Sequence, residues 1–339
     1  MINKERLSTK KWFATAPSNI ALIKYMGKVE GMGNRPTNSS LSYTLPHLRS
    51  LIELELLSEG ENEQNVVDQW EPLIEFEGKS YPAMELSPRG RERFLKHLAM
   101  LKSKFGLKGQ FVIRSTNDFP SDCGLASSAS SFAALTKVFA SALRDWPTRQ
   151  MPPLSVLEAA DLSRMGSGSS CRSFFAPWAI WSADRIGDVP ELQSKGDLIH
   201  MAVVVSDTVK SVSSSEAHRK VATSLLFSGR PERAENRIRR LISALSEGNW
   251  RLAHDITWAE FWDMHALFET CEQPFTYMTA DSIEVLNRVR QEWTRSNDGP
   301  LVTMDAGPNV HLLFRADQVG REMADHYKYK LLQDFRVIS

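Results

Sequence analysis

Residues 120–129 read Pro-Ser-Asp-Cys-Gly-Leu-Ala-Ser-Ser-Ala and lead directly into a long run of small and apolar residues. A turn of this composition exposes backbone N–H groups, and the start of a helix adds a partial positive charge, so the segment suits a phosphate group. The hydroxyls of Ser127 and Ser128 can add hydrogen bonds or contact a phosphate-bound magnesium ion. The same residues equally suit a capped helix with close packing. Neither the usual P-loop nor the G-x-G-x-x-G pattern occurs in the sequence.

The elements on either side of this segment predict an α+β protein. Periodicity indicates strands at the positions 12–16, 50–57, 111–115, 201–205, 301–304, 310–314 and 335–338. It indicates helices over 126–143, 154–165, 216–227, 230–247, 250–269, 281–294 and 318–327. Helices gathered beside mixed strands favour two closely packed halves with a boundary in 187–197. We therefore expect an N-terminal domain over 1–190 and a C-terminal domain over 191–339.

The composition excludes several classes of protein. Lys plus Arg and Asp plus Glu each total 41, so the 339-residue chain carries no basic footprint for nucleic acid or an anionic membrane. Its three cysteines, Cys123, Cys171 and Cys271, have no zinc-site spacing, which favours reduced thiols in the cytosol. No apolar stretch is long enough to cross a bilayer, and the N-terminus has no signal-peptide pattern. We expect a cytoplasmic protein with a small-molecule substrate and no nucleic-acid or membrane partner.

A second anion-binding segment is Ala-Pro-Ser-Asn-Ile-Ala-Leu-Ile-Lys-Tyr-Met-Gly-Lys at 16–28. It places Lys24 and Lys28 on either side of Tyr25, and a lysine ammonium acts on phosphate as a point charge while tyrosine adds a directional hydroxyl. On spacing alone, a strand and turn with surface lysines is the simpler interpretation.

A third segment, Gly-Ser-Gly-Ser-Ser-Cys-Arg at 166–172, combines glycines and hydroxyls with one arginine. Arg172 can hold a carboxylate or a phosphate through two parallel hydrogen bonds. A flexible turn whose arginine makes a structural ion pair is the alternative.

Two further segments contribute polar groups. Residues 210–215, Lys-Ser-Val-Ser-Ser-Ser, form a polar loop that can close over phosphates, although most such loops are only solvated. Asp305 begins the turn Asp-Ala-Gly-Pro-Asn, where a carboxylate is often only a turn former. The histidines have no metal spacing, and a packed or surface role is expected for them. No G-x-S-x-G elbow supports a Ser-His-Asp site.

In their order along the chain, these segments resemble the GHMP small-molecule kinase superfamily and, within it, the diphosphomevalonate decarboxylase family. The likeness covers nearly the whole chain and depends on the stretches 17–28, 35–42, 119–129, 166–172, 210–227 and 304–309. Gly-Leu-Ala-Ser-Ser-Ala is typical of the superfamily. Gly-Ser-Gly-Ser-x-Cys-Arg and Asp-Ala-Gly-Pro-Asn are typical of the decarboxylase branch.

The resemblance implies a two-domain GHMP kinase fold. Its N-terminal α/β domain, 1–190, is expected to resemble ribosomal protein S5 domain 2 and to carry the nucleotide-phosphate motif. Its C-terminal domain, 191–339, is expected to be ferredoxin-like and to carry a catalytic aspartate. The family uses ATP and Mg²⁺ and forms cytosolic homodimers. The implied reaction converts (R)-mevalonate 5-diphosphate and ATP to isopentenyl diphosphate, ADP, phosphate and CO₂ in the mevalonate route to isoprenoids.

The resemblance also implies catalytic roles. Asp305 acts on the 3-hydroxyl, either as a base or as an electrostatic stabiliser, and the sequence leaves both roles open. Lys24 orients this carboxylate and keeps it ionised. Arg172 holds the substrate carboxylate, and Asn19 orders either Arg172 or the substrate.

Binding roles follow from the same motifs. Residues implied to bind substrate are Tyr25, Met26, Gly27, Lys28, Arg89, Ser167, Gly168, Ser169, Ser170, Cys171, Arg172 and Ser214. Residues implied to bind the nucleotide are Gly124, Leu125, Ala126, Ser127, Ser128, Ala129 and Ser213, with Ser127 and Ser128 also near Mg²⁺. Met26 replaces a tryptophan common in the family, the loop after Lys210 lacks the usual Gly-Met, and Arg91 competes with Arg89 for the diphosphate.

Three other functions remain open at this stage. A mevalonate 3-kinase would phosphorylate without decarboxylating, but the pairing of Lys24 with Asp305 argues against it. A phosphomevalonate decarboxylase would use the monophosphate, whereas Tyr25 and Lys28 favour the diphosphate. A non-catalytic homologue that binds a ligand is expected to lose catalytic groups, and none of the expected groups is missing.

Overall fold

The computed structural model describes residues 10–58, 67–119, 127–146, 152–206 and 211–339. The chain forms two compact units. Unit 1 comprises Met1–Ser18, Pro46–Phe119 and Ser127–Phe174, and unit 2 comprises Asn19–Leu45, Pro120–Ala126 and Phe175–Ser339. Strands β1 (Lys11–Ile23) and β2 (Ser40–Ser58) each contribute to both units. Because each unit combines separate stretches of chain, the expected domain boundary at residue 190 stays a prediction.

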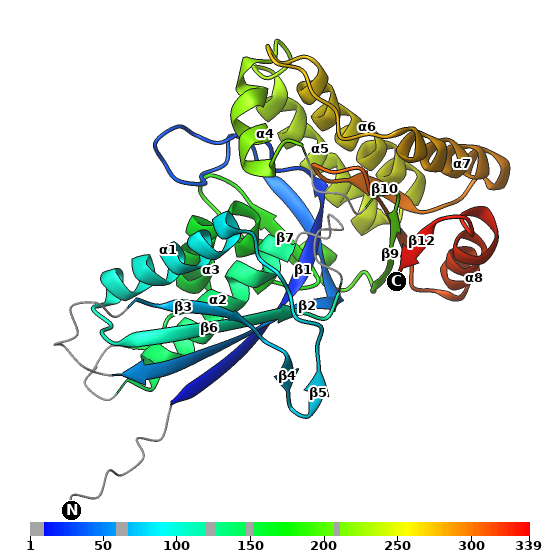
Figure 1. Cartoon of the computed structure of the whole chain (residues 1–339). Coiled ribbons are helices and arrows are strands. Elements are labelled where there is room, and N and C mark those ends of the chain that lie inside the picture. The colour runs from blue at the N-terminus through cyan, green and yellow to red at the C-terminus, as the bar shows by residue number, and fades with distance from the viewer. Residues whose placement is uncertain (1–9, 59–66, 120–126, 147–151, 207–210) are drawn as a thin grey trace, which may run out of the picture. The chain divides into compact units, whose positions relative to one another are not determined.

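Unit 1 is a sheet covered by three helices. Within it, β6 (Gln110–Asn117) pairs antiparallel with β2 and parallel with β3 (Gln69–Pro72). Helices α1 (Pro88–Phe105), α2 (Ser127–Arg144) and α3 (Val156–Gly166) lie on one side of these strands (Figure 1). A hairpin of β4 (Glu75–Phe76) and β5 (Lys79–Ser80) follows β3.

The core of unit 1 confirms the strand predicted over 50–57, whose side chains alternate between two faces. Ile52, Leu54 and Leu56 are buried in one hydrophobic cluster with side chains of α1, α2 and α3. The intervening Glu53 and Glu55 take the other face, where both carboxylates pair with the guanidinium of Arg114 on β6. Burying carboxylates is tolerated here because each has a cationic partner.

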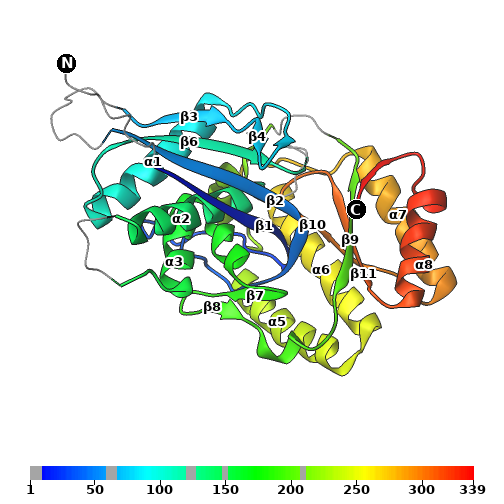
Figure 2. The ribbon, with the colours of Figure 1, turned by 90° about the horizontal axis from the view of Figure 1, so that it is seen from below.

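Unit 2 contains an antiparallel four-stranded sheet in the order β10 (Leu301–Met304), β11 (Val310–Arg315), β9 (Leu198–Val204) and β12 (Arg336–Ile338). Its helices are α4 (Ser214–Lys220), α5 (Arg230–Glu247), α6 (Trp250–Glu269), α7 (Ala280–Ser296) and α8 (Gln318–His326). Side chains of α6, α7 and α8 share one hydrophobic cluster with this sheet. Figure 2 shows α7 beside α8.

The remaining elements of unit 2 are short. The first part of β2 pairs with β7 (Trp178–Trp181), which pairs with β8 (Ile186–Asp188). Single turns of helix occur at η2 (Pro190–Leu192), η3 (Val221–Thr223) and η4 (Tyr327–Leu331). No helix among the described residues is both long and apolar enough for a membrane span.

The sequence patterns predicted most of these elements. The α+β class is confirmed, and α5, α6 and β10 have the predicted bounds. The helix predicted over 216–227 was wrong in its second half, because α4 ends at Lys220 and only the turn η3 follows. Helix α1 was missed, although Ser87 caps it by accepting from the Gly90 N–H and Pro88 begins it, which is a readable start signal.

Candidate active site

The centre of the candidate site is an ion pair in unit 2. Lys24 follows the last residue of β1, Asp305 follows the last residue of β10, and Lys24 Nζ donates to Asp305 Oδ1 at 2.7 Å. The lysine side chain is 2% exposed, whereas the aspartate side chain is 28% exposed. The structure therefore brings together the predicted catalytic pair and leaves its carboxylate partly open to a ligand.

Buried polar and charged side chains hold the backbone of Lys24. Its N–H donates to Glu260 Oε1 at 2.9 Å, and its carbonyl accepts from Asn38 Nδ2 at 2.9 Å and from Arg230 Nη2 at 3.2 Å. Arg230 and Glu260 are fully buried and form an ion pair with each other. Burial alone lowers the pKa of the Arg230 guanidinium, but Glu260 and Asp263 outweigh it and raise that pKa above its ordinary value. Hydrogen bonds therefore hold both the N–H and the carbonyl of Lys24.

A histidine holds the backbone of Asp305. The carbonyl of Asp305 accepts from the Gly307 N–H at 2.8 Å and lies 3.2 Å from His265 Nε2. Because a carbonyl can only accept, His265 carries its proton on Nε2. Burial, followed by the charge of Lys24, lowers the pKa of His265 to about 4, so the ring is neutral at physiological pH. Sequence reasoning missed this contact because it depends on α6 reaching the turn.

Residues 25–28 directly follow Lys24 in the sequence and form a compact turn. Tyr25 donates its hydroxyl proton to the Asn34 carbonyl at 3.0 Å, and Lys28 Nζ donates to Asn34 Oδ1 at 2.7 Å. The predicted diphosphate ligands Tyr25 and Lys28 therefore meet at one residue. Met26, in contrast, has its side chain buried in a hydrophobic cluster, so only its backbone is available to a substrate. Asn19 is 2% exposed.

The polar segment after residue 210 leads into α4. Lys210 lies outside the described residues. Ser213 caps the helix by accepting from the Glu216 N–H at 3.3 Å, and Ser214 is exposed in its first turn. The Ser213 hydroxyl is thus partly engaged in capping, whereas that of Ser214 is open, and their ligand roles stay predictions.

The Gly-Ser-Gly-Ser-Ser-Cys-Arg segment lies in unit 1 and forms the end of α3 and the 3₁₀ helix η1 (Gly168–Phe174). Glycine is required at 166, where a Cβ would lie 2.1 Å from a ring carbon of Phe132. The Ser170 hydroxyl lies 2.8 Å from the Ser163 hydroxyl and 2.6 Å from the Ser167 carbonyl. The side chain of Ser170 therefore faces the interior of the unit.

Cys171 also points inward. Its thiol donates to the Gly168 carbonyl at 3.2 Å, and burial raises its pKa to about 12. Any contact of Ser170 or Cys171 with substrate must then use the backbone. Ser169 is half-buried, while Arg172 is 3% exposed. The binding roles of this segment stay predictions.

The described part of the nucleotide motif begins α2. Gly124, Leu125 and Ala126 lie outside the described residues. Ser127 and Ser128 are the first residues of α2, Ala129 is buried behind them, and the Ser128 hydroxyl lies 3.3 Å from that of Ser167. Hydroxyl oxygens at the start of a long helix suit a phosphate and its Mg²⁺. The described residues contain no group of three or more His, Cys, Asp or Glu side chains that could hold a metal by themselves.

The competing arginines of α1 are now distinguished by their contacts. Arg91 donates to the Leu86 carbonyl at 3.1 Å and lies over the ring of Trp70. Arg93 donates to the Gly166 carbonyl at 2.9 Å. Arg89 is exposed in the first turn of α1, which keeps it the better candidate for the diphosphate.

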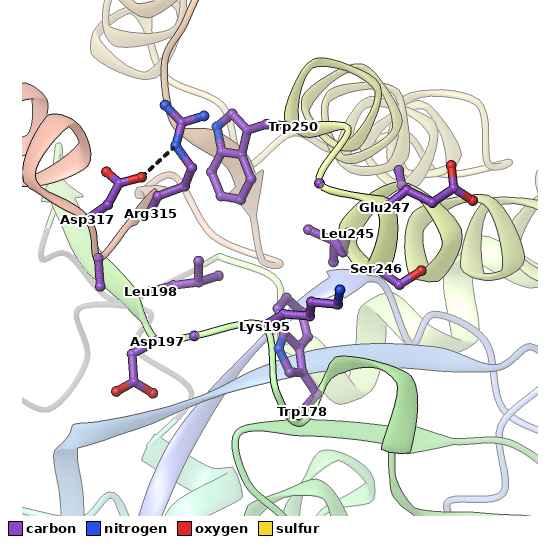
Figure 3. Close-up of a pocket in the computed structure, with 14 residues that line it drawn as sticks. Trp178, Lys195, Asp197, Leu198, Leu245, Ser246, Glu247, Trp250, Arg315 and Asp317 are labelled. Atoms are coloured by element: carbon purple, nitrogen blue, oxygen red, sulfur yellow. Dashed lines mark ion pairs between the residues drawn. The ribbon is translucent and has the colours of Figure 1, made fainter.

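A cavity of about 520 Å³ in unit 2 lies elsewhere (Figure 3). It is lined by the C-terminal turn of α5, the start of β9 and the connection from β11 to α8, and none of the predicted site residues lines it. Its Arg315 is already paired with Asp298 and Asp317. The chemistry of Lys24 and Asp305, and not the size of this cavity, therefore identifies the candidate site.

Comparison with known proteins identifies the family. Residues 16–189 match the diphosphomevalonate decarboxylase-like N-terminal domain, and residues 200–333 match the mevalonate 5-diphosphate decarboxylase C-terminal domain. The chain belongs to the diphosphomevalonate decarboxylase family. The diphosphomevalonate decarboxylase of Saccharomyces cerevisiae is 31% identical over 332 residues, covering 93% of this chain and 80% of the yeast protein.

Solved structures of this family have the same fold. The mevalonate diphosphate decarboxylase of Legionella pneumophila is 46% identical with a TM-score of 0.86, over 97% of this chain and 100% of the Legionella chain. MDDEF, solved in complex with MVAPP, AMPPCP and magnesium, is 26% identical with a TM-score of 0.79, over 97% of this chain and 96% of its own. The expected two-domain GHMP fold and the family resemblance are confirmed.

Proposed function

We propose that this chain is an ATP-dependent decarboxylase of mevalonate 5-diphosphate. The observation that carries this proposal is the Lys24–Asp305 ion pair, in which a buried ammonium lies 2.7 Å from a partly exposed carboxylate. The γ-phosphoryl group of ATP is transferred to the tertiary 3-hydroxyl, giving ADP. The new phosphate then leaves with the C–O electron pair, and the C–C bond to the carboxylate breaks. Its electrons form the double bond of isopentenyl diphosphate, and CO₂ departs.

Asp305 acts beside the 3-hydroxyl in this proposal. Its carboxylate accepts the hydroxyl proton or stabilises the positive charge that develops as the phosphate leaves. Lys24 favours the ionised form of that carboxylate because an opposite charge in contact stabilises it. Since Glu260, Asn38 and Arg230 fix the Lys24 backbone, the pair needs little reorganisation during the reaction.

The other predicted residues bind the two substrates. Arg172 holds the substrate carboxylate, Asn19 orders this contact, and Tyr25, Lys28 and Arg89 bind the diphosphate. Contacts to substrate are also assigned to Met26, Gly27, Ser167, Gly168, Ser169, Ser170, Cys171 and Ser214. Contacts to ATP are assigned to Gly124, Leu125, Ala126, Ser127, Ser128, Ala129 and Ser213. Mg²⁺ would neutralise phosphate charge when bound, and we assign the hydroxyls of Ser127 and Ser128 to hold it.

We also propose the domain division and assembly implied by the family. An N-terminal domain over 1–190 and a C-terminal domain over 191–339 are supported by the two family matches, which end at 189 and begin at 200. A cytoplasmic homodimer rests on the family resemblance alone. Size-exclusion chromatography with light scattering measures the oligomeric state directly.

A product assay tests the activity. Purified protein is incubated with ATP and Mg²⁺ and with mevalonate, its 5-phosphate or its 5-diphosphate, and ADP and CO₂ are measured separately. We expect equal amounts of ADP and CO₂ with the diphosphate alone. ADP without CO₂ would assign a 3-kinase, activity with the monophosphate would assign the sibling decarboxylase, and neither product would indicate a ligand-binding homologue.

A further inference from the structure

We propose that His218 is a positioning residue that anchors the turn at 25–28 and thereby sets the preference for a 5-diphosphate over a 5-monophosphate. The inference rests on the proposed function, because Tyr25 and Lys28 are its diphosphate ligands. The Gly27 N–H donates to His218 Nδ1 at 3.0 Å, and the imidazole lies 4.3 Å from the ring of Tyr25. One side chain on α4 therefore contacts both the backbone and an aromatic ring of this turn.

The hydrogen bond defines the chemical state of His218. A backbone N–H can only donate, so Nδ1 carries a lone pair and Nε2 carries the proton. Burial, followed by the charge of Lys28, lowers the pKa of His218 to about 3. The ring is therefore a neutral acceptor for Gly27.

The backbone at Gly27 has a conformation and surroundings that only glycine fits. Gly27 has a φ of 102°, and a Cβ there would lie 2.4 Å from Thr37 Oγ1 and 2.7 Å from the Phe227 ring. Two other contacts of this turn are longer, since the Thr37 nitrogen lies 3.4 Å from the Gly27 carbonyl and Thr37 Oγ1 lies 3.4 Å from the Met26 carbonyl. Directly after the turn, the Lys28–Pro36 bridge includes a hydrogen bond of 2.9 Å from the Val29 N–H to the Arg35 carbonyl. The bond to His218 is shorter than both contacts with Thr37.

The same histidine fixes the aromatic ring of Tyr25. That ring contacts the imidazole at 4.3 Å and the indole of Trp181 at 4.6 Å, measured between ring centroids. Its hydroxyl then reaches the Asn34 carbonyl, beside the contact of Lys28 with the Asn34 side chain. Loss of the anchor at Gly27 displaces Tyr25 and Lys28 together, so the contact with the second phosphate weakens most.

Two substitutions separate the hydrogen bond from the ring. His218→Phe keeps an aromatic ring but removes the acceptor, whereas His218→Asn removes the ring and places an amide oxygen near Nδ1. We expect His218→Phe to raise the KM for the diphosphate by about tenfold, the size of one lost hydrogen bond, with little change in kcat. The ratio of kcat/KM for the diphosphate to that for the monophosphate falls by the same factor. His218→Asn recovers most of this loss.

The matched control is His254→Phe. His254 is also a buried histidine of unit 2 with one backbone contact, from Nδ1 to the Pro300 carbonyl at 2.9 Å, and it takes no part in the proposed site. This variant should leave the substrate preference unchanged. An unchanged preference in His218→Phe, or an equal loss in His218→Asn, would overturn the inference.

An NMR measurement separates this inference from the proposed function. ¹H–¹⁵N spectra of the full-length protein should show His218 protonated on Nε2 and a Gly27 amide that shifts in His218→Phe and returns in His218→Asn. If the wild-type protein turns over neither phosphate ester, the proposed function and the selectivity fail while these spectra still test the anchor. If the chemical shift of the Gly27 amide changes in neither variant, the hydrogen bond from Gly27 to His218 does not hold the turn.

Discussion

Two ion pairs of unit 2 each join a cationic side chain to a carboxylate, in different surroundings. In the first, the buried ammonium of Lys24 contacts the Asp305 carboxylate, whose side chain is 28% exposed. In the second, Arg230 and Glu260 are both fully buried, and Asp263, Arg233 and Arg237 extend the cluster. A buried pair contributes little net stability after desolvation, yet removing one partner is costly. The closed pair therefore maintains structure, and the open carboxylate is available for chemistry.

The open carboxylate should give the largest effect on the reaction. Asp305→Asn keeps an acceptor for Lys24 but removes the charge, and we expect turnover to fall by about 10³-fold or more. Coupled release of ADP and CO₂ measures the loss. Nucleotide and substrate binding, followed by calorimetry, should be retained. Near-normal turnover in this variant would show that Asp305 takes no part in the mechanism. The functional difference inferred between the two ion pairs would then be wrong.

Breaking the buried Arg230–Glu260 pair should lower the stability of the fold. Glu260→Ala leaves the Arg230 guanidinium buried beside a cavity, and we expect the free energy of unfolding to fall by about 3–5 kcal/mol. Denaturant titration followed by circular dichroism measures it. Arg144→Ala, at an exposed arginine of α2, is the control and should change this energy little. A Glu260→Ala protein as stable as the wild type would contradict the structural role.

Asp263, at the edge of the same cluster, should make the free energy of unfolding depend on pH in the acid range. Burial raises the pKa of Asp263, but its hydrogen bond with Arg233 and the charge of Arg230 outweigh this and lower the pKa from 3.8 to about 2. A carboxyl with a depressed folded-state pKa adds stability above its unfolded pKa and loses it as pH falls through the folded value. The contribution, about 2 kcal/mol, is therefore present above pH 4 and disappears toward pH 2.

Comparison with Asp263→Asn isolates this effect. The difference in unfolding free energy between wild type and variant should shrink as the pH falls from 4 to 2, because in that range the Asp263 carboxyl of the unfolded chain takes up a proton while that of the folded protein is still largely ionised. A difference that stays constant across this interval would show that Asp263 has no depressed pKa.

The sequence predicted that Lys24 and Asp305 pair, which the structure confirms, and missed the residues that hold their backbones. Lys24 and Asp305 stand in recognisable motifs, and the periodicity of α5 and α6 located both helices with their bounds. Glu260 reaches the Lys24 N–H across 236 positions of sequence, and no local pattern reports a contact of that span. His218 and His265 were expected to be packed or surface residues, and their burial confirms the packed role, but no local pattern reports their contacts with Gly27 and Asp305. Their neutral state follows from burial, which only the folded chain defines.

The distance along the chain between Lys24 and Asp305 also bears on biosynthesis. The two residues are 281 positions apart, and Arg230 lies 206 positions after Lys24. At ribosomal rates of about 5–20 residues per second, Lys24 is synthesised about 14–56 s before Asp305. A nascent chain that ends before residue 305 has its lysine but not its carboxylate. Under the roles proposed for these two residues, catalytic competence is acquired only near the end of translation, after most of the chain has been synthesised.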